Sequence, residues 1–252
     1  DNILVNGDII GLIIIGGIGF LTWEDICEYK WKFKNYRMQS KLILATTVCL
    51  IIFPACFFFF ADFQHLPVKS RFLASVFQSV TPRTAGFNTV DITMMTEASK
   101  VVMILLMLIG GSPGSTAGGM KTTTFAVLLL NAVATFKSQE HAGAFGRRID
   151  DQVIKSASSI AMLYFMMFLA GGIMISTAEG LPILSSLFEA ASAMGTVGLT
   201  LGITPSLHKI SLYVLILLMY MGRVGGLTLI YAVFSGKNKA NARFPMEKVM
   251  IG

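Results

Sequence analysis

The stretches TAGFN (84–88) and TVGLT (196–200) share a T-x-G-hydrophobe pattern and lie 112 positions apart (196 minus 84). Each follows a semi-apolar segment too short to cross a membrane, FLASVFQSV (72–80) or LPILSSLFEAASAM (181–194). Each is followed by a full apolar run. A single T-x-G match is common by chance, but two matches at one offset in the same hydropathy context predict an internal duplication.

The composition is that of a membrane protein. Of the 252 residues, 54% are hydrophobic and only 13% are charged, and the mean hydropathy is +0.69. Soluble globular proteins carry about 25% charged residues, so lipid is the expected solvent for most of the surface. The net charge of +6 is interpreted as a sign of membrane orientation, and nucleic acid is not an expected partner.

Apolar runs and basic residues predict the topology. The runs 42–61 and 153–177 are long enough to cross the membrane as helices, which takes about 20 residues. The run 210–234 qualifies if it tolerates Arg223, whereas 101–136 is interrupted by GGSPGSTAGG, and 7–23 is a shorter run that fits the remainder of a helix. Basic residues cluster between these runs and predict one cytoplasmic face. The cluster contains Lys30, Lys32, Lys34, Arg37, Lys41, Lys137, Arg147, Arg148, Lys155, Lys237, Lys239, Arg243 and Lys248.

The duplicated unit is predicted to be an outer helix, a re-entrant half-helix, the T-x-G loop and an inner helix. A non-helical loop at membrane depth persists only where it lines water or is buried in protein. A ring of such loops can offer backbone carbonyls that replace the hydration shell of a cation, and glycine permits the backbone angles this requires. The predicted ion filter consists of Thr84, Ala85, Gly86, Phe87, Asn88, Thr196, Val197, Gly198, Leu199 and Thr200.

Four stretches, SVTPRTAGFNT, GGSPGSTAGGMKTTT, ASAMGTVGLT and YMGRVGGL, together resemble the membrane subunit of the Ktr/Trk/HKT superfamily of potassium transporters, of the KtrB type. The resemblance covers essentially the whole chain. It implies an all-α integral membrane protein with four helix–pore loop–helix repeats related to potassium-channel pore modules. It also implies a homodimer seated on a cytosolic nucleotide-binding regulatory ring (KtrA-like).

On this resemblance the chain holds the C-terminal half of the subunit, and GGIGFLT (16–22) aligns with GRVGGLT (222–228) as the end of an earlier inner helix. The expected segments are the end of the inner helix of the second repeat (1–26), a cytoplasmic loop (27–41), the third pore repeat with a broken inner helix (42–136), a cytoplasmic loop (137–152), the fourth pore repeat (153–236) and a cytoplasmic tail (237–252).

The glycine-rich stretch breaks the inner helix of the third repeat near mid-membrane, because each glycine costs about 1 kcal/mol and proline about 3 kcal/mol in a helix. A phosphate-binding loop is disfavoured, since Met120 separates Lys121 from the second glycine of the pattern. The resemblance implies a movable gate in the ion pathway; a passive kink is the alternative. The predicted gate comprises Gly110, Gly111, Ser112, Pro113, Gly114, Ser115, Thr116, Ala117, Gly118, Gly119 and Arg223.

Arg223 aligns with Gly111 and is expected to face the cavity, because a central arginine costs about 2.5–3.5 kcal/mol on insertion scales. It acts either as an electrostatic barrier to cations or as a packing residue bonded to loop carbonyls. Lys121 is assigned a structural role, by snorkelling to the cytoplasm or bonding loop carbonyls. Glu189 is expected to brace the fourth filter segment from behind, Asn88 and Thr200 to bond the backs of their segments, and Arg83 to be a bracing or mouth residue.

These features predict a multi-pass membrane protein, and the resemblance, together with the glycine in both filter segments, implies potassium uptake across the bacterial plasma membrane. Sodium remains a second candidate ion, and no organic cofactor is expected. The alternative is a membrane-embedded enzyme or a scaffold subunit without permeation. An enzyme would need acids, histidines or metal ligands converging at depth, and the three histidines and three cysteines show no such spacing. A scaffold would leave the paired loops unexplained.

Overall fold

The computed structural model of the chain describes residues 3–225. The predicted end of the fourth inner helix (226–234) and the tail (237–252) with its four basic residues lie outside these residues. The described helices are α1 (Ile3–Ile18), α2 (Phe20–Tyr29), α3 (Met38–Ala61), α4 (Val68–Val80), α5 (Glu97–Leu108), α6 (Thr122–Phe136), α7 (Asp151–Glu179), α8 (Ile183–Met194) and α9 (Lys209–Val224). Short 3-10 turns are η1 (Phe33–Asn35), η2 (Phe63–His65), η3 (Ile92–Met94) and η4 (Thr204–Ser206).

The all-α class predicted from the sequence is confirmed, with one small exception. Between α6 and α7, β1 (Gly143–Ala144) and β2 (Arg147–Arg148) form an antiparallel hairpin that the sequence analysis did not predict. Phe145 and Gly146 at its tip both have positive φ, 53° and 76°. Two such residues make the tight turn whose twist matches a two-residue hairpin.

Helices α3 and α7 are long and apolar enough to cross a membrane, with 24 and 29 residues. They contain the predicted runs 42–61 and 153–177 and begin a few residues earlier. The N-terminal run differs from the prediction of a single helical remainder, because α1 and α2 meet at a bend of 98°. Gly19 forms this bend with φ 88°. A Cβ at Gly19 would lie 2.5 Å from the carbonyl oxygen of Pro113, so glycine permits a close approach of two backbones here.

The duplication is visible in the backbone. The turns η3 and η4 are separated by 112 positions (204 minus 92), as are the first residues of α5 and α9 (209 minus 97). The backbone of both T-x-G threonines is in the left-handed region, with φ 65° at Thr84 and 51° at Thr196. Helix α1 is a further copy of the inner helix and precedes both repeats. Its first and last residues are each 206 positions before those of α9 (209 minus 3, 224 minus 18). Each helix is followed by a glycine of similar φ, 88° at Gly19 and 86° at Gly225.

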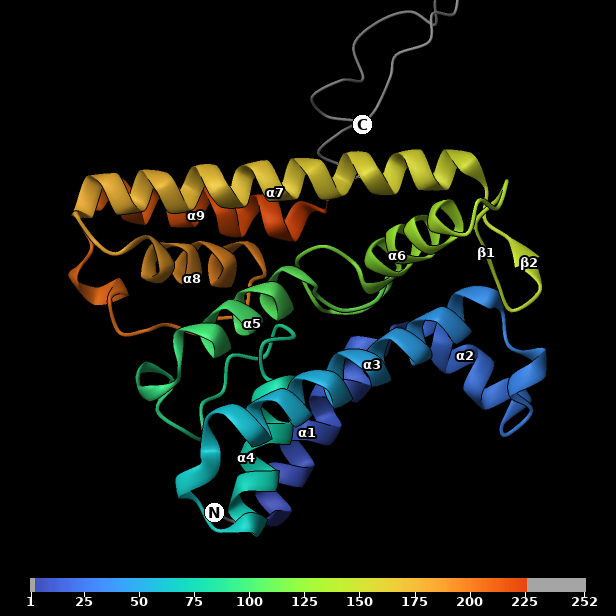
Figure 1. Cartoon of the computed structure of the whole chain (residues 1–252), viewed down its shortest axis with the longest axis horizontal. Coiled ribbons are helices and arrows are strands. Elements are labelled where there is room, and N and C mark those ends of the chain that lie inside the picture. Colours follow the sequence, from blue (N-terminus) through green and yellow to red (C-terminus); the bar gives the residue numbers. More distant parts are fainter. Residues whose placement is uncertain (1–2, 226–252) are drawn as a thin grey trace, which may run out of the picture.

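Each half-helix packs between its own outer helix and the preceding inner helix. Thus α4 contacts α3 and α1, and α8 contacts α7 and α5, and also α9. Large buried side chains of α5 and α8 join the main core, among them Met107, Phe188 and Met194. The second half of the broken inner helix, α6, packs against both outer helices, α3 and α7. In Figure 1 the α2–α3 connection and the hairpin lie at one end of the molecule, and the turns after α3 and α7 lie at the other.

Candidate functional site

The two predicted filter segments follow the C-terminal ends of α4 and α8, and each has its threonine at positive φ, although their hydrogen bonds differ. In the first, the amides of Ala85 and Gly86 both donate to the carbonyl of Thr81, at 3.2 Å each. In the second, Val197 donates to the carbonyl of Ser192 at 2.8 Å. A threonine at positive φ is a strained, uncommon conformation for a β-branched residue. Its occurrence at both equivalent positions shows that the surrounding structure imposes it twice.

The structure brings the two segments together. A Cβ at Gly86 would lie 2.2 Å from the carbonyl oxygen of Val197, so the two backbones are in direct contact at this point. A Cβ at Gly198, by contrast, would meet no atom within 4 Å, and Gly198 is exposed. One face of the paired segments is thus packed backbone against backbone, while Gly198 faces open space.

Glu189 holds the end of the fourth-repeat segment. Glu189 is 3% exposed, and Oε1 of its carboxylate accepts hydrogen bonds from the Thr200 hydroxyl at 2.6 Å and the Leu201 amide at 3.0 Å. Oε2 accepts from the Thr204 hydroxyl at 2.7 Å. These are the bracing contacts expected of Glu189 and Thr200. Asn88 differs: it is exposed, and its side chain makes no hydrogen bond among residues 3–225.

The third-repeat segment is held by different groups. The hydroxyl of Thr81 donates to the carbonyl of Phe87 at 2.6 Å. Arg83 is 5% exposed and its Nη2 donates to the hydroxyl of Thr47 on α3 at 3.4 Å. Of the two roles expected for Arg83, this buried position agrees with a bracing residue and not with an exposed mouth.

The glycine-rich stretch forms a closed loop between α5 and α6. Ile109 and Met120 pair in a parallel bridge, in which the amide of Gly110 donates to the carbonyl of Met120 at 2.8 Å. The amide of Thr122 donates to the carbonyl of Gly111 at 3.1 Å. The two ends of the loop therefore lie side by side, and the broken inner helix continues beyond them.

Hydroxyl groups and one lysine tie the loop internally. The buried hydroxyls of Ser112 and Thr122 are 3.1 Å apart, and the Ser115 hydroxyl donates to the carbonyl of Ser112 at 2.6 Å. Lys121 donates through Nζ to the carbonyl of Ala117 at 2.6 Å. Of the two structural roles expected for Lys121, the structure has the bond to a loop carbonyl.

The loop also joins the ends of two inner helices. On one side, the amide of Ser112 donates to the carbonyl of Gly17 at 2.9 Å, near the end of α1. On the other side, the amide of Gly119 donates to the carbonyl of Gly222 at 3.2 Å. Arg223 reaches the loop from α9 and donates through Nη1 to the carbonyl of Thr116 at 2.6 Å. The predicted partner of Arg223, a loop carbonyl, is therefore present.

The loop lies directly against the fourth-repeat filter segment. A Cβ at Gly118 would lie 2.2 Å from the hydroxyl oxygen of Thr196. A Cβ at Gly110 would lie 1.9 Å from the carbonyl oxygen of Gly118, across the loop itself. Glycine at both positions lets the backbone fill this space, so a side chain at either would displace the loop or the filter segment.

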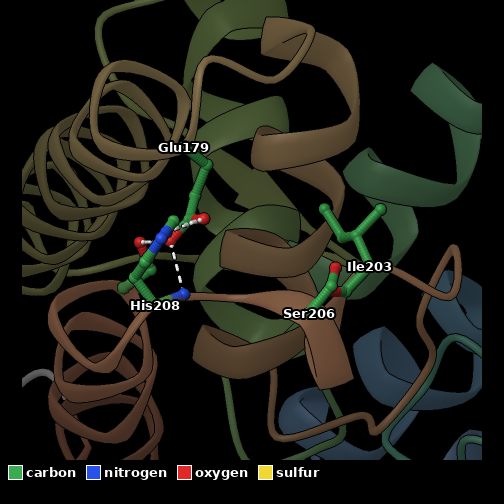
Figure 2. A network of polar contacts seen from close by, with 5 residues as sticks. Glu179, Ile203, Ser206 and His208 are labelled. Carbon is green, nitrogen blue, oxygen red and sulfur yellow. Dashed lines mark hydrogen bonds and ion pairs between the residues drawn. The ribbon is translucent and has the colours of Figure 1, made fainter.

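A carboxylate clamp at the other end of the inner helices was missed by the sequence analysis. Figure 2 shows His208 reaching Glu179, whose carboxylate accepts from the amide of His208 at 2.8 Å and from Nδ1 at 2.7 Å. The hydroxyl of Ser211 also donates to Glu179, at 2.5 Å.

The third repeat has an equivalent clamp. Asp62 accepts from the amide of Thr96 at 2.8 Å and from the hydroxyl of Ser99. In each repeat the clamp ties the end of the outer helix to the start of the inner helix. The pairs Thr96 with His208 and Ser99 with Ser211 obey the same 112-residue offset, which is the signal that could have revealed them.

Comparison with known proteins gives a consistent result. A family model described as TrkH, cation transport protein, matches residues 1–240. The chain is 38% identical over 252 residues to the potassium/sodium uptake protein NtpJ of Enterococcus hirae, covering 96% of this chain and 56% of that protein. It is 35% identical over 254 residues to the Ktr system potassium uptake protein B of Bacillus subtilis, covering 98% of this chain and 57% of that protein.

The fold is likewise similar to a solved structure. The crystal structure of the potassium transporter TrkH from Vibrio parahaemolyticus superposes with a TM-score of 0.76 at 21% identity, over 92% of this chain and 52% of that one. The chain thus spans little more than half the length of the relatives it matches, in agreement with the expected C-terminal half. The relatives quoted are named as ion transport proteins and not as enzymes.

Proposed function

The chain belongs to the TrkH family of cation transport proteins, multi-pass proteins of the bacterial cell membrane, and from this premise we propose that it supplies half of a potassium uptake pathway. The ion path runs through filter segments 84–88 and 196–200, which bind dehydrated potassium through backbone carbonyls. Sodium is the second candidate ion, and the chain uses no organic cofactor.

One observation carries this proposal: two duplicated segments with the same left-handed threonine meet backbone to backbone at Gly86 and Val197. Their half-helices α4 and α8 end at these segments. A helix C-terminus carries partial negative charge and attracts a cation. Glycine at the third position of each segment keeps the backbone, and not a side chain, at the point of approach.

We further propose that the loop of residues 110–119 is the gate and that the structure represents its closed form. The loop touches the filter at Thr196 and is bonded to α1 and α9. Arg223 adds a positive charge at this level and is bonded to the loop. Opening requires these bonds to break together, so a movement of α9 or of α1 displaces the loop.

The assembly is proposed to be a homodimer regulated by a cytosolic nucleotide-binding ring (KtrA-like). Two considerations support it: the resemblance to the KtrB type, and the name of a relative as protein B of a Ktr system. The basic connection between α6 and α7, with Arg147 and Arg148, offers a surface for such a ring. Movement of the ring would then act on the helices that hold the loop.

The direct test is uptake by the full-length protein in a bacterium that lacks its own potassium uptake systems. Growth and potassium accumulation at micromolar potassium are expected, and no rescue by a well-expressed protein would contradict the proposal. Replacing Gly86 or Gly198 with serine is expected to relax selectivity, so that sodium accumulation rises relative to potassium. Gly180→Ser is the matched control for Gly198→Ser, because Gly180 also has positive φ (66°) and open space but lies at the end of α7, away from the filter segments.

A further inference from the structure

The connection between α2 and α3 alternates basic and aromatic residues in the stretch KWKFKNYR (30–37). Trp31 is 99% exposed, the largest exposed fraction among the large hydrophobic side chains of residues 3–225. The stretch and Lys41 just beyond it contain five basic residues and no acidic residue. A fully exposed indole among cations is unfavourable in water and calls for an apolar or amphipathic partner.

This connection is held in a fixed shape. The Tyr36 hydroxyl donates to the carbonyl of Lys30 and closes the turn. Lys41 donates through Nζ to the carbonyl of Lys34 at 2.7 Å, and its ammonium lies 5.8 Å and 5.9 Å from the ring centroids of Phe33 and Phe145. Phe145 belongs to the tip of the β1–β2 hairpin, so two separate connections form one surface.

Three of the cations on this surface have no ionic partner in the described part of the chain. Arg37 is paired, with Nη2 2.9 Å from Glu24 and Nε 3.4 Å from Asp25. Lys30, Lys32 and Lys34 are exposed and form no ion pair with residues 3–225. The surface therefore has surplus positive charge beside an exposed indole.

The surface lies at the level of lipid headgroups. Helix α3 begins at Met38 directly after the stretch, and its 24 residues span about 36 Å, slightly more than the hydrocarbon core of about 30 Å. Tryptophan is enriched at this level because its ring is amphipathic, and lysine clusters just cytoplasmic of a membrane helix attract anionic lipids.

We propose that residues 30–34, supported by Lys41 and Phe145, form a binding site for anionic phospholipid of the inner leaflet. The ammonium groups of Lys32 and Lys34 bind the phosphate, and Trp31 enters the interface beside the glycerol region. Each lysine near a membrane surface contributes about 1 kcal/mol. Removing two of them should therefore weaken binding about 30-fold.

The test uses the full-length protein in detergent, without any cytosolic subunit. Brominated phosphatidylglycerol is titrated, and quenching of Trp31 is isolated as the difference between wild type and Trp31→Phe. Brominated phosphatidylcholine gives the zwitterionic reference. Lys32→Gln/Lys34→Gln is compared with Lys69→Gln/Lys209→Gln, which removes the same charge from exposed residues in the first turns of α4 and α9.

We expect half-saturation by phosphatidylglycerol to rise about 30-fold in the Lys32/Lys34 variant and to stay unchanged in the control. Equal quenching by the two lipids in wild type, or equal loss in both double variants, would overturn the proposal. Normal binding of phosphatidylglycerol by the Lys32/Lys34 variant would overturn it as well, since the lysines would then not contact the phosphate. Transport activity is not a readout, so the result is independent of the proposed gate.

Discussion

Replacing Arg223 tests the gate most directly. Its guanidinium is bonded to the carbonyl of Thr116 at 2.6 Å, and Arg223 is otherwise exposed. A hydrogen bond from a charged donor contributes about 1.5–3 kcal/mol, and exposure favours the lower figure. If the bond exists only in the closed form, Arg223→Ala should shift the open-to-closed ratio by about tenfold, which corresponds to about 1.4 kcal/mol.

The assay is potassium flux into liposomes that contain the full-length protein without the proposed regulatory ring, where the closed form should dominate. About tenfold higher flux is expected for Arg223→Ala. Arg223→Gln separates charge from bonding, because it keeps an amide donor and loses the charge; Arg223→Lys keeps the charge. If the charge is the barrier, the glutamine variant conducts and the lysine variant stays near wild type.

Lys137→Gln serves as the charge-matched control, because Lys137 is exposed at the end of α6 away from the loop. Unchanged flux in an Arg223→Ala protein that is folded and inserted in the liposomes would remove this residue from the proposed gate. Equal rises in Arg223→Ala and Lys137→Gln would refute the reasoning as well, since the effect would then follow net charge and not the loop contact.

Three further outcomes follow from the structure. Gly118→Ala places a methyl group 2.2 Å from the Thr196 hydroxyl, so it should displace the loop and raise basal flux, whereas Gly7→Ala, with nothing within 4 Å of its Cβ, should not. Glu189→Ala removes three hydrogen bonds behind the filter. It should lower the midpoint of thermal unfolding and reduce potassium-over-sodium selectivity. An unchanged selectivity would reject the bracing role. Glu179→Ala should destabilise the fold by about 1.5–3 kcal/mol through loss of charged hydrogen bonds, with ion selectivity retained, as checked by chemical denaturation and flux.

The duplication could be predicted from sequence because it rests on local chemistry. The T-x-G pattern, the half-helix before it and the apolar run after it all recur at one offset, and η3, η4, α5 and α9 obey the same offset in the structure. The position of the loop could be predicted as well, since glycine and proline are the residues least tolerated in a helix. The carboxylates of the two clamps are harder to predict than their partners, because Asp62 and Glu179 are separated by 117 positions (179 minus 62) and depart from the repeat offset that Thr96/His208 and Ser99/Ser211 obey.

The bend at Gly19 was missed for a different reason. In the sequence, Gly19 lies within an apolar run that continues on both sides, and one glycine costs a helix only about 1 kcal/mol. The bend depends on the approach of Pro113 from a segment nearly a hundred residues away. The hairpin tip likewise depends on long-range contact, since Phe145 packs edge-on against Phe33 with ring centroids 6.4 Å apart. Sequence periodicity contains no information on either contact.

The ends of the inner helices α1 and α9 are stabilised by hydrogen bonds from other segments. A helix that ends at membrane depth leaves backbone carbonyls without partners, and lipid cannot supply them. At the end of α1, the indole of Trp23 donates to the carbonyl of Ile15 at 3.0 Å, and the loop amide of Ser112 donates to the carbonyl of Gly17. At the end of α9, the loop amide of Gly119 donates to the carbonyl of Gly222.

The interrupted middle helix therefore provides the donors that its two neighbours need. Moving the loop aside exposes the carbonyls of Gly17 and Gly222 together, and only water can replace its amides there. For the proposed gate, opening of the loop and wetting of the space it leaves are therefore expected to be one event, with a pathway that is dry at the loop when closed and hydrated when open.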